Sequence, residues 1–262
     1  KTTLRSWYKK NKSQLHKGTK KQGKVYLFCD EFTNFYDVSV GIDALEFLSF
    51  VGFQPLLVAH AESGRSAISK GMLSYAQNIA NQNIETFKDL LSDETPLVGI
   101  EPSAILTFRD EYLRLASDKE AASRIAKYCH TLEEFLQGLI KKGGLTPALF
   151  TKKKKTIKIH GYCHQKALST THSIFDILNL PMNYSVSILN TGCCGMAGSF
   201  GYEKEHYKLS MQIGEHSLFP KIRNCTKDTV LAVSGTSCRH QITAGTKRDS
   251  LHPISILKQA LR

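Results

Sequence analysis

The chain has 262 residues, 41% hydrophobic and 22% charged, which is enough for one large domain or two modest ones with a real core. No apolar run approaches the about 20 residues of a membrane-spanning helix, and the first residues lack the apolar segment of a secretory signal. The composition therefore excludes a membrane-spanning chain and favours a cytoplasmic protein.

The net charge of +12 is concentrated at the start, where residues 1–24 carry nine Lys or Arg and no acid. A second basic run, Lys152 to Lys155, comes later. Neither run has the interleaved aromatic residues of a nucleic-acid reader, so we expect no nucleic-acid partner. We predict a basic leader or linker at 1–23. It is either solvated or docked on an acidic partner or on anionic lipid at the inner face of the membrane.

In chain order, strand and helix patterns alternate, and the pattern occurs twice. In the first half we predict strands at 24–29, 54–58 and 96–100, and helices at 40–51, 67–91 and after residue 104. In the second half we predict strands at 156–160, 185–189 and 229–233, and helices at 165–178, 202–213, after residue 238, and 252–261.

Corresponding positions in the two halves indicate an internal duplication. Cys29 matches Cys163 and Ala104 matches Cys238, each at an offset of 134 positions. Glu62-Ser63-Gly64 matches Cys193-Cys194-Gly195 at an offset of 131 positions. We predict an α/β protein of two pseudo-repeated Rossmann-like halves, at 24–150 and 151–262, each a small, mostly parallel sheet flanked by helices.

Seven cysteines at irregular spacing favour metal or redox use in a reducing compartment over a disulfide framework. Four of them follow predicted strands of the second half: Cys163, Cys193, Cys194 and Cys238. Because the carboxyl ends of parallel strands meet at one edge of a sheet, we expect these four thiols to converge. In the first half only Cys29 remains, so we expect a degenerate copy that lost its ligands. Cys129 and Cys225 are expected to be ordinary thiols.

The segment 191–201 contains the two adjacent cysteines and four glycines, and is predicted to be a strand–turn–helix junction. Neighbouring cysteines form a disulfide only in a strained ring, so a metal is the simplest partner for the pair. Four thiolates suit an iron–sulfur cluster or, as the chemical rival, a structural zinc ion. Two buried apolar thiols, or a thiol nucleophile at Cys193 or Cys194, are the other interpretations of this segment.

Three residues beside the cysteines are expected to support them from outside the ligand set: His164, Gly195 and His240. For the two histidines, the other interpretations are direct ligation of the metal and a partly buried polar side chain next to a turn. No catalytic residue and no nucleotide-phosphate loop is predicted.

The segments Gly161-Tyr162-Cys163-His164, Gly192 to Gly201 and Ser237 to Ile242 resemble the cysteine-rich CCG domain family. This family includes a cysteine-rich subunit of heterodisulfide reductase and the iron–sulfur subunit of glycolate oxidase. The chain also looks like the C-terminal part of fused FAD-linked oxidases with an iron–sulfur module, which resemble D-lactate and D-2-hydroxyglutarate dehydrogenases.

The resemblance implies that Cys163, Cys193, Cys194 and Cys238 bind an iron–sulfur cluster, with zinc as a substitute. Gly235 stands where the family pattern has a further cysteine, which leaves four thiolates and favours a simpler cluster than a five-cysteine one. The implied role is electron transfer from a flavin toward a quinone or another acceptor. FAD-linked oxidase and ferredoxin-like domains of the parent polypeptide are the expected partners, FAD would lie upstream, and the fragment is not expected to be active alone.

Overall fold

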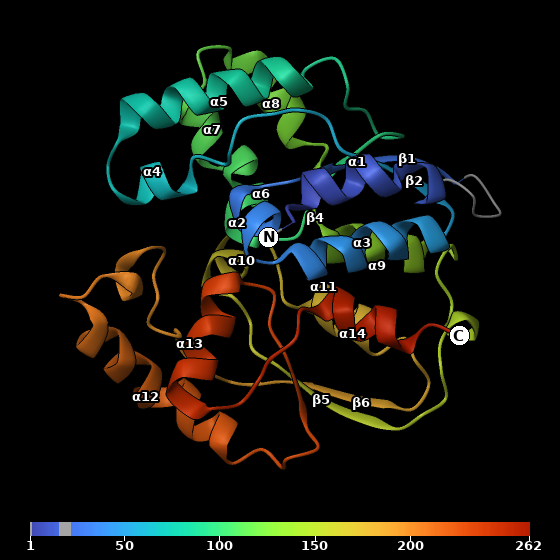
Figure 1. Cartoon of the computed structure of the whole chain (residues 1–262), viewed down its shortest axis with the longest axis vertical. Helices are drawn as coiled ribbons and strands as arrows, with labels where there is room; N and C mark the ends of the chain where they lie inside the picture. The colour runs from blue at the N-terminus through green and yellow to red at the C-terminus, as the bar shows by residue number, and fades with distance from the viewer. Residues whose placement is uncertain (1, 16–21) are drawn as a thin grey trace. The chain divides into compact units, whose positions relative to one another are not determined.

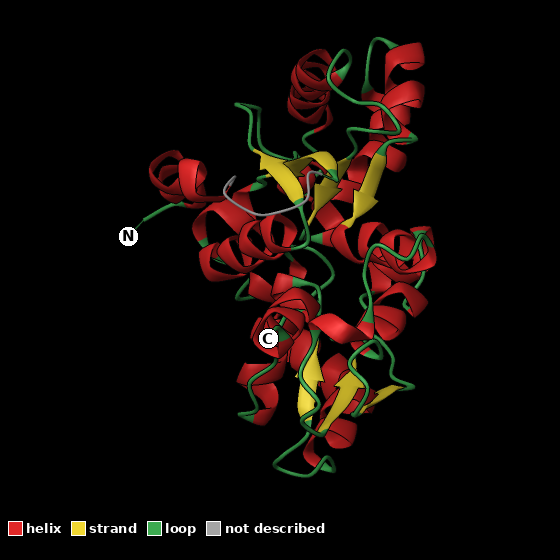
Figure 2. Cartoon of the chain, turned by 90° about the vertical axis from the view of Figure 1, so that its right-hand side faces the viewer, coloured by secondary structure: helices red, strands yellow, loops and turns green. Residues whose placement is uncertain are grey.

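The structure is a computed structural model that describes residues 2–15 and 22–262. The remaining positions of the predicted leader, 1 and 16–21, lie outside the described residues. The chain divides into two compact units, Lys1–Phe135 and Leu136–Arg262, each with its own group of strands among helices (Figure 2). The division falls inside one helix, whereas the predicted extents of the two copies, 24–150 and 151–262, follow the sequence pattern and stay a prediction.

The first unit contains a parallel sheet of four strands in the order β2-β1-β3-β4. Its strands are β1 (Gly23–Phe28), β2 (Phe53–Leu56), β3 (Leu97–Gly99) and β4 (Cys129–Thr131). Its helices are α1 (Leu4–Leu15), α2 (Glu31–Phe35), α3 (Val38–Phe50), α4 (Arg65–Ser69), α5 (Leu73–Phe87), α6 (Pro102–Ile105), η1 (Leu106–Arg109), α7 (Glu111–Leu115) and α8 (Lys119–Ala126). The helix α9 (Leu132–Lys141) carries the boundary between the units.

The second unit contains a parallel sheet of three strands in the order β6-β5-β7. Its strands are β5 (Lys155–Ile159), β6 (Tyr184–Ile188) and β7 (Val230–Ala232). Its helices are η2 (Pro147–Leu149), α10 (Cys163–Leu168), α11 (His172–Leu178), η3 (Phe200–Tyr202), α12 (Tyr207–Arg223), α13 (Thr236–Thr246) and α14 (Pro253–Ala260). The crossover from β5 to β6 contains α11, and the crossover from β6 to β7 contains α12. The helix α14 packs against α11, and α13 packs against α12 (Figure 1).

The predicted α/β class with two similar halves is confirmed by the strand orders. In each unit the first strand is central, the second pairs on one side and the third on the other. Phe28 pairs with Gly99 in the first sheet, and Ile159 pairs with Ala232 in the second. The residues that follow these two strands, Cys29 and His160, therefore occupy equivalent places. The strand register therefore replaces the predicted match of Cys29 with Cys163 by a match of Cys29 with His160.

The helix α1 is a structured part of the predicted basic leader, and the expectation of a solvated linker is wrong for residues 4–15. Leu4, Tyr8 and Leu15 are buried, and α1 packs on α2 and α3. The Arg5 guanidinium donates hydrogen bonds to the carbonyl oxygens of Val58 at 2.8 Å and Cys29 at 3.3 Å. The apolar face of α1 is hard to recognise in the sequence because the lysines of the helix, which lie on its opposite side, dominate its composition.

Two predicted helices are divided in the structure. The pattern at 67–91 is interrupted at Gly71, which has φ of 71°, and becomes α4 and α5. The pattern at 165–178 breaks after Leu168 into α10 and α11. Among the described residues, no helix has both the length and the apolar character needed to cross a bilayer.

The first prediction concerns the packing of α1. Leu4 has no exposed surface and fills the space above Gly41 in α3. We expect Leu4→Ala to lower the free energy of unfolding by about 2–5 kcal/mol, because it removes a fully buried side chain. Lys9→Ala, on the exposed side of α1, should change it by no more than about 0.5 kcal/mol. Urea unfolding followed by circular dichroism measures both, and equal effects would contradict the packing described.

Candidate metal centre

The candidate metal centre lies at the carboxyl ends of β5, β6 and β7, where three loops begin. Cys163 is the first residue of α10, and Cys238 is in the first turn of α13. Cys193 and Cys194 lie in the long loop between β6 and α12. The sequence predicted that this loop would enter a helix at Tyr202, but α12 begins only at Tyr207. The helix starts at this site therefore carry Cys163 and Cys238 rather than the adjacent pair.

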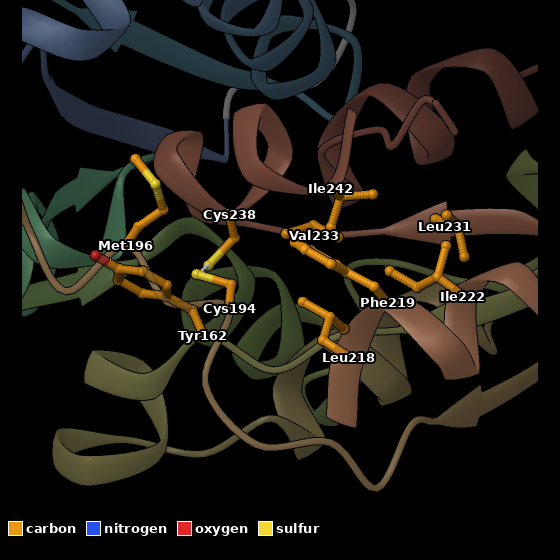
Figure 3. Close-up of a cluster of buried hydrophobic side chains, with 10 residues drawn as sticks. All are labelled: Tyr162, Cys194, Met196, Leu218, Phe219, Ile222, Leu231, Val233, Cys238 and Ile242. Atoms are coloured by element: carbon orange, nitrogen blue, oxygen red, sulfur yellow. Dashed lines mark hydrogen bonds between the residues drawn. The ribbon is translucent and has the colours of Figure 1, made fainter. Parts of the chain in front are cut away.

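The structure brings the four thiols into one continuous group. Cys194 Sγ and Cys238 Sγ are 3.0 Å apart, and their sulfur atoms point toward each other in Figure 3. The thiol of Cys193 interacts closely enough with those of Cys163 and Cys194 to shift the pKa of all three. Sulfurs from three separate loops thus meet although 75 positions separate the first from the last.

The two sides of this thiol group differ in exposure. Cys194 and Cys238 are 2% and 0% exposed, and belong to an apolar cluster that continues through Phe219 to Leu231 (Figure 3). Cys193 is half-buried and Cys163 is exposed. Any group held here is therefore backed by apolar side chains and reachable from solvent on the Cys163 side.

The interactions among the thiols shift their pKa values in opposite directions. Hydrogen bonds from Cys163 and Cys194 lower the pKa of Cys193 well below the ordinary thiol value. The hydrogen bond to Cys193 raises the pKa of Cys163, and those to Cys193 and Cys238 raise the pKa of Cys194. Of these three thiols, Cys193 is the one whose surroundings favour the thiolate form. Soft metals bind the thiolate form of cysteine.

Gly195 holds the turn after the cysteine pair. Its φ is 96°, a conformation that favours glycine, and its amide N–H donates to Cys193 Sγ at 3.3 Å. A side chain at this position would collide with the backbone carbonyl oxygen of Ser210 in α12. The loop can therefore lie directly on α12, and the amide stabilises negative charge on the Cys193 sulfur. That Gly195 supports a bound metal stays a prediction.

Gly235 permits a second close approach, between the start of α13 and the ring of Tyr162. A Cβ built on Gly235 would lie 2.7 Å from the Tyr162 ring. Tyr162 is 9% exposed and packs in the same apolar cluster as Cys194 and Cys238 (Figure 3). An aromatic side chain therefore fills the space that a cysteine at 235 would need. Arg239 secures the same loop by donating to the Val233 carbonyl oxygen at 2.9 Å.

The two histidines expected to support the cysteines take different positions. His164 is half-buried in α10 beside Cys163. His240 is exposed, and its Nδ1 lies 2.8 Å from the Tyr202 hydroxyl. His240 thus ties α13 to the loop that carries the cysteine pair. Whether either histidine supports a bound metal stays a prediction.

A third histidine, His160, was missed as a site residue by the sequence reasoning. It follows β5 directly and is 1% exposed. A ring nitrogen of His160 and the sulfurs of Cys194 and Cys238 all lie within 4.8 Å of one another. The signal was available, because His160 ends a predicted strand at the same edge as the cysteines, but its spacing from Cys163 matches no familiar metal motif.

The equivalent place in the first unit is filled by hydrogen bonds among its own side chains. The Glu31 carboxylate accepts from the Ser63 amide at 2.8 Å and from the Ser63 hydroxyl at 2.6 Å. Burial raises the pKa of Cys29 to about 12, so this thiol stays protonated. Burial, with Arg5 adding to it, lowers the pKa of His60 to about 4, and His60 Nε2 accepts from the Cys29 amide at 3.1 Å. These contacts occupy the strand ends of the first unit; that this half is a degenerate copy stays a prediction.

Comparison with known proteins places similar sequences among dehydrogenases. D-2-hydroxyglutarate dehydrogenase of Pantoea ananatis is 25% identical over 244 residues, which cover 93% of this chain and 23% of that protein. The enzyme of the same name from Escherichia coli K12 is 26% identical over 244 residues. One subunit of the anaerobic glycerol-3-phosphate dehydrogenase of Escherichia coli K12 is 26% identical over 263 residues, 99% of this chain and 64% of that protein.

This chain is related to oxidoreductases. It spans about a quarter of the length of the D-2-hydroxyglutarate dehydrogenases it matches. No family model matches the chain.

The turn at Gly195 gives the second prediction. We expect Gly195→Ala to lower the free energy of unfolding by about 2–4 kcal/mol, because it adds both a strained φ and a backbone collision. Gly192→Ala is the matched control in the same loop, since its nearest neighbour is Ser217 Cβ at 3.9 Å. Chemical denaturation of the two variants decides the point, and an equal loss in both would contradict the assigned role of Gly195.

The contact between Gly235 and Tyr162 gives the third prediction. We expect Gly235→Ala to cost about 1–3 kcal/mol of stability in the wild-type background, because the new methyl group overpacks against the ring. In a Tyr162→Ala background most of that loss should disappear. A double-mutant cycle of unfolding free energies measures this coupling. Purely additive losses would show that the ring is not what excludes a side chain at 235.

Proposed function

We propose that this chain is the iron–sulfur electron-transfer module of a flavin-linked 2-hydroxyacid dehydrogenase. The observation that carries the proposal is the contact among four thiols from three loops at one edge of a sheet. A site of soft sulfur donors backed by apolar side chains suits an iron–sulfur cluster. The relatives support the assignment, since all those named above are dehydrogenases or a dehydrogenase subunit.

The donor set fits such a cluster. Cys163, Cys193, Cys194 and Cys238 would hold it, and a bound cluster would supply reversible one-electron transfer. The Gly195 amide would then donate to a ligating sulfur, as it donates to Cys193 Sγ now. Such hydrogen bonds favour the reduced form because they stabilise added negative charge. The exposed Cys163 side would be where electrons enter or leave.

The rest of the parent protein would supply the flavin. The D-2-hydroxyglutarate dehydrogenases extend well beyond the matched region, and we place an FAD-linked oxidase domain and a ferredoxin-like domain there. The chain would pass electrons from flavin toward a quinone or another acceptor, as expected of a cysteine-rich CCG domain, and would be inactive alone. We place the protein in the cytoplasm, with a peripheral contact at the inner face of the membrane through its basic residues.

A zinc-stabilised or metal-free structural domain of the same oxidoreductase is the second candidate. The observation that favours it is the burial of Cys194 and Cys238 within an apolar cluster, where thiols pack as small hydrophobic residues. A closed four-thiolate zinc site would be redox-silent. The two candidates differ in the metal found and in whether the bound centre accepts an electron.

Anaerobic reconstitution with iron and sulfide provides the fourth prediction. We expect the wild-type protein to gain broad visible absorption and, after reduction, an electron paramagnetic resonance signal. Cys194→Ser should reduce the iron bound at least tenfold, because it removes a buried ligand. Cys225→Ser is the control, since this half-buried thiol hydrogen-bonds the Lys221 carbonyl oxygen, away from the group of four.

Three other outcomes would contradict the redox assignment. Zinc alone in the purified protein, with no iron taken up, would support the structural candidate. The structural candidate would also be supported if Cys194→Ser lowered the stability of the protein while the wild type assembled no cluster. A rapidly alkylated Cys193 with no metal requirement would instead indicate a thiol nucleophile.

A further inference from the structure

The strongest unexplained feature of the second unit is the His160 side chain. Its backbone is fixed by the sheet, because the His160 amide donates to the Ala232 carbonyl oxygen at 3.0 Å. Its Nδ1 lies 2.8 Å from the Thr191 hydroxyl. Its Nε2 is fully buried and has no hydrogen-bond partner within the described part of the chain. A buried polar atom left in this condition destabilises the fold and points to a missing partner.

The nearest candidates for that partner are sulfur atoms and whatever they bind. A His160 ring nitrogen lies within 4.8 Å of both Cys194 Sγ and Cys238 Sγ, and all three residues are buried. Since Nδ1 is engaged by Thr191, the nitrogen left for this space is Nε2. Neutral imidazole nitrogen and thiolate sulfur are both good ligands for zinc, cobalt and iron.

Thr191 fixes the orientation and the tautomer that ligation needs. When the Thr191 hydroxyl accepts the Nδ1–H, the lone pair is on Nε2, as in most metal-bound histidines. Thr191 is itself held in place: its amide donates to the Leu189 carbonyl oxygen at 3.0 Å, and its carbonyl oxygen accepts from Lys166 Nζ at 3.3 Å. The loop that carries the cysteine pair therefore also positions the imidazole.

We propose that His160 is a direct ligand of the metal centre through Nε2, beside Cys194 and Cys238, with Thr191 as its positioning residue. The centre then has four thiolates and one imidazole as protein donors. This inference rests on the proposed function only in that a metal centre is formed. A neutral imidazole adds no negative charge, so the centre is easier to reduce than one in which a fifth thiolate takes the place of His160.

Cobalt(II) binding to the metal-free, reduced protein tests the ligand set without any enzymatic activity. We expect wild type to show thiolate-to-cobalt charge transfer and the d–d bands of a mixed nitrogen–sulfur site. His160→Ala should weaken cobalt affinity at least tenfold and shift the d–d bands. Thr191→Val should weaken it about 10–100-fold while keeping the wild-type band positions. His216→Ala, an exposed histidine on α12, is the control and should match wild type.

A second measurement does not depend on the stability of the alanine variant. After reconstitution with iron, pulsed electron paramagnetic resonance of the reduced, 15N-histidine-labelled protein should show a directly bound nitrogen. His160→Cys should lose that coupling and have a lower reduction potential than wild type.

The outcomes separate this inference from the proposed function. Wild-type cobalt affinity and spectrum in His160→Ala would overturn the inference, as would a cluster without coupled nitrogen, and both leave the electron-transfer role standing. Failure of wild type to bind cobalt would overturn it as well. A His160-dependent cobalt site in a protein that assembles no iron cluster would support the ligand and refute the electron-transfer role.

Discussion

The second unit depends on one constraint: three parallel strands end at the same edge, and each is followed by a loop that carries sulfur. Parallel pairing of β5 with β6 and β7 fixes this edge, and the close packing of Gly195 on α12 and of Gly235 on Tyr162 brings the loops inward. The sulfurs then touch at the end of an apolar cluster. Backbone pairing thus determines the chemistry available to side chains that are distant in sequence.

The first unit shows what the same scaffold becomes with other side chains at the strand ends. A carboxylate and a serine, Glu31 and Ser63, satisfy each other where the second unit has sulfur. The Arg5 side chain of α1 donates hydrogen bonds to the carbonyl oxygens of Val58 and Cys29 at this edge. The edge is closed by internal polar contacts, whereas in the second unit the polar contacts leave the Nε2 atom of His160 without a partner in the described residues.

Sequence patterns predicted the parts that depend on local periodicity and on strand order. The strands, the paired halves and the four converging cysteines are of this kind, because parallel strand ends must share an edge. What the sequence could not give depends on packing between distant positions. The polar stretch after Tyr202 has a helical composition, yet Gly201 packs against Met196 and Ser210, so the loop continues to α12. The buried face of α1 and the contact of Tyr162 with Gly235 could not be predicted either, because both depend on packing between positions that are distant in the sequence.

The ring of Tyr162 above Gly235 also restricts how this site can change over generations. If a cysteine arose at position 235 first, it would destabilise the protein without adding a ligand to the site, because the Tyr162 ring would still fill the space. A smaller residue at 162 has to come first. The order of the two substitutions is therefore set by packing, and a one-step route to a richer sulfur site is closed.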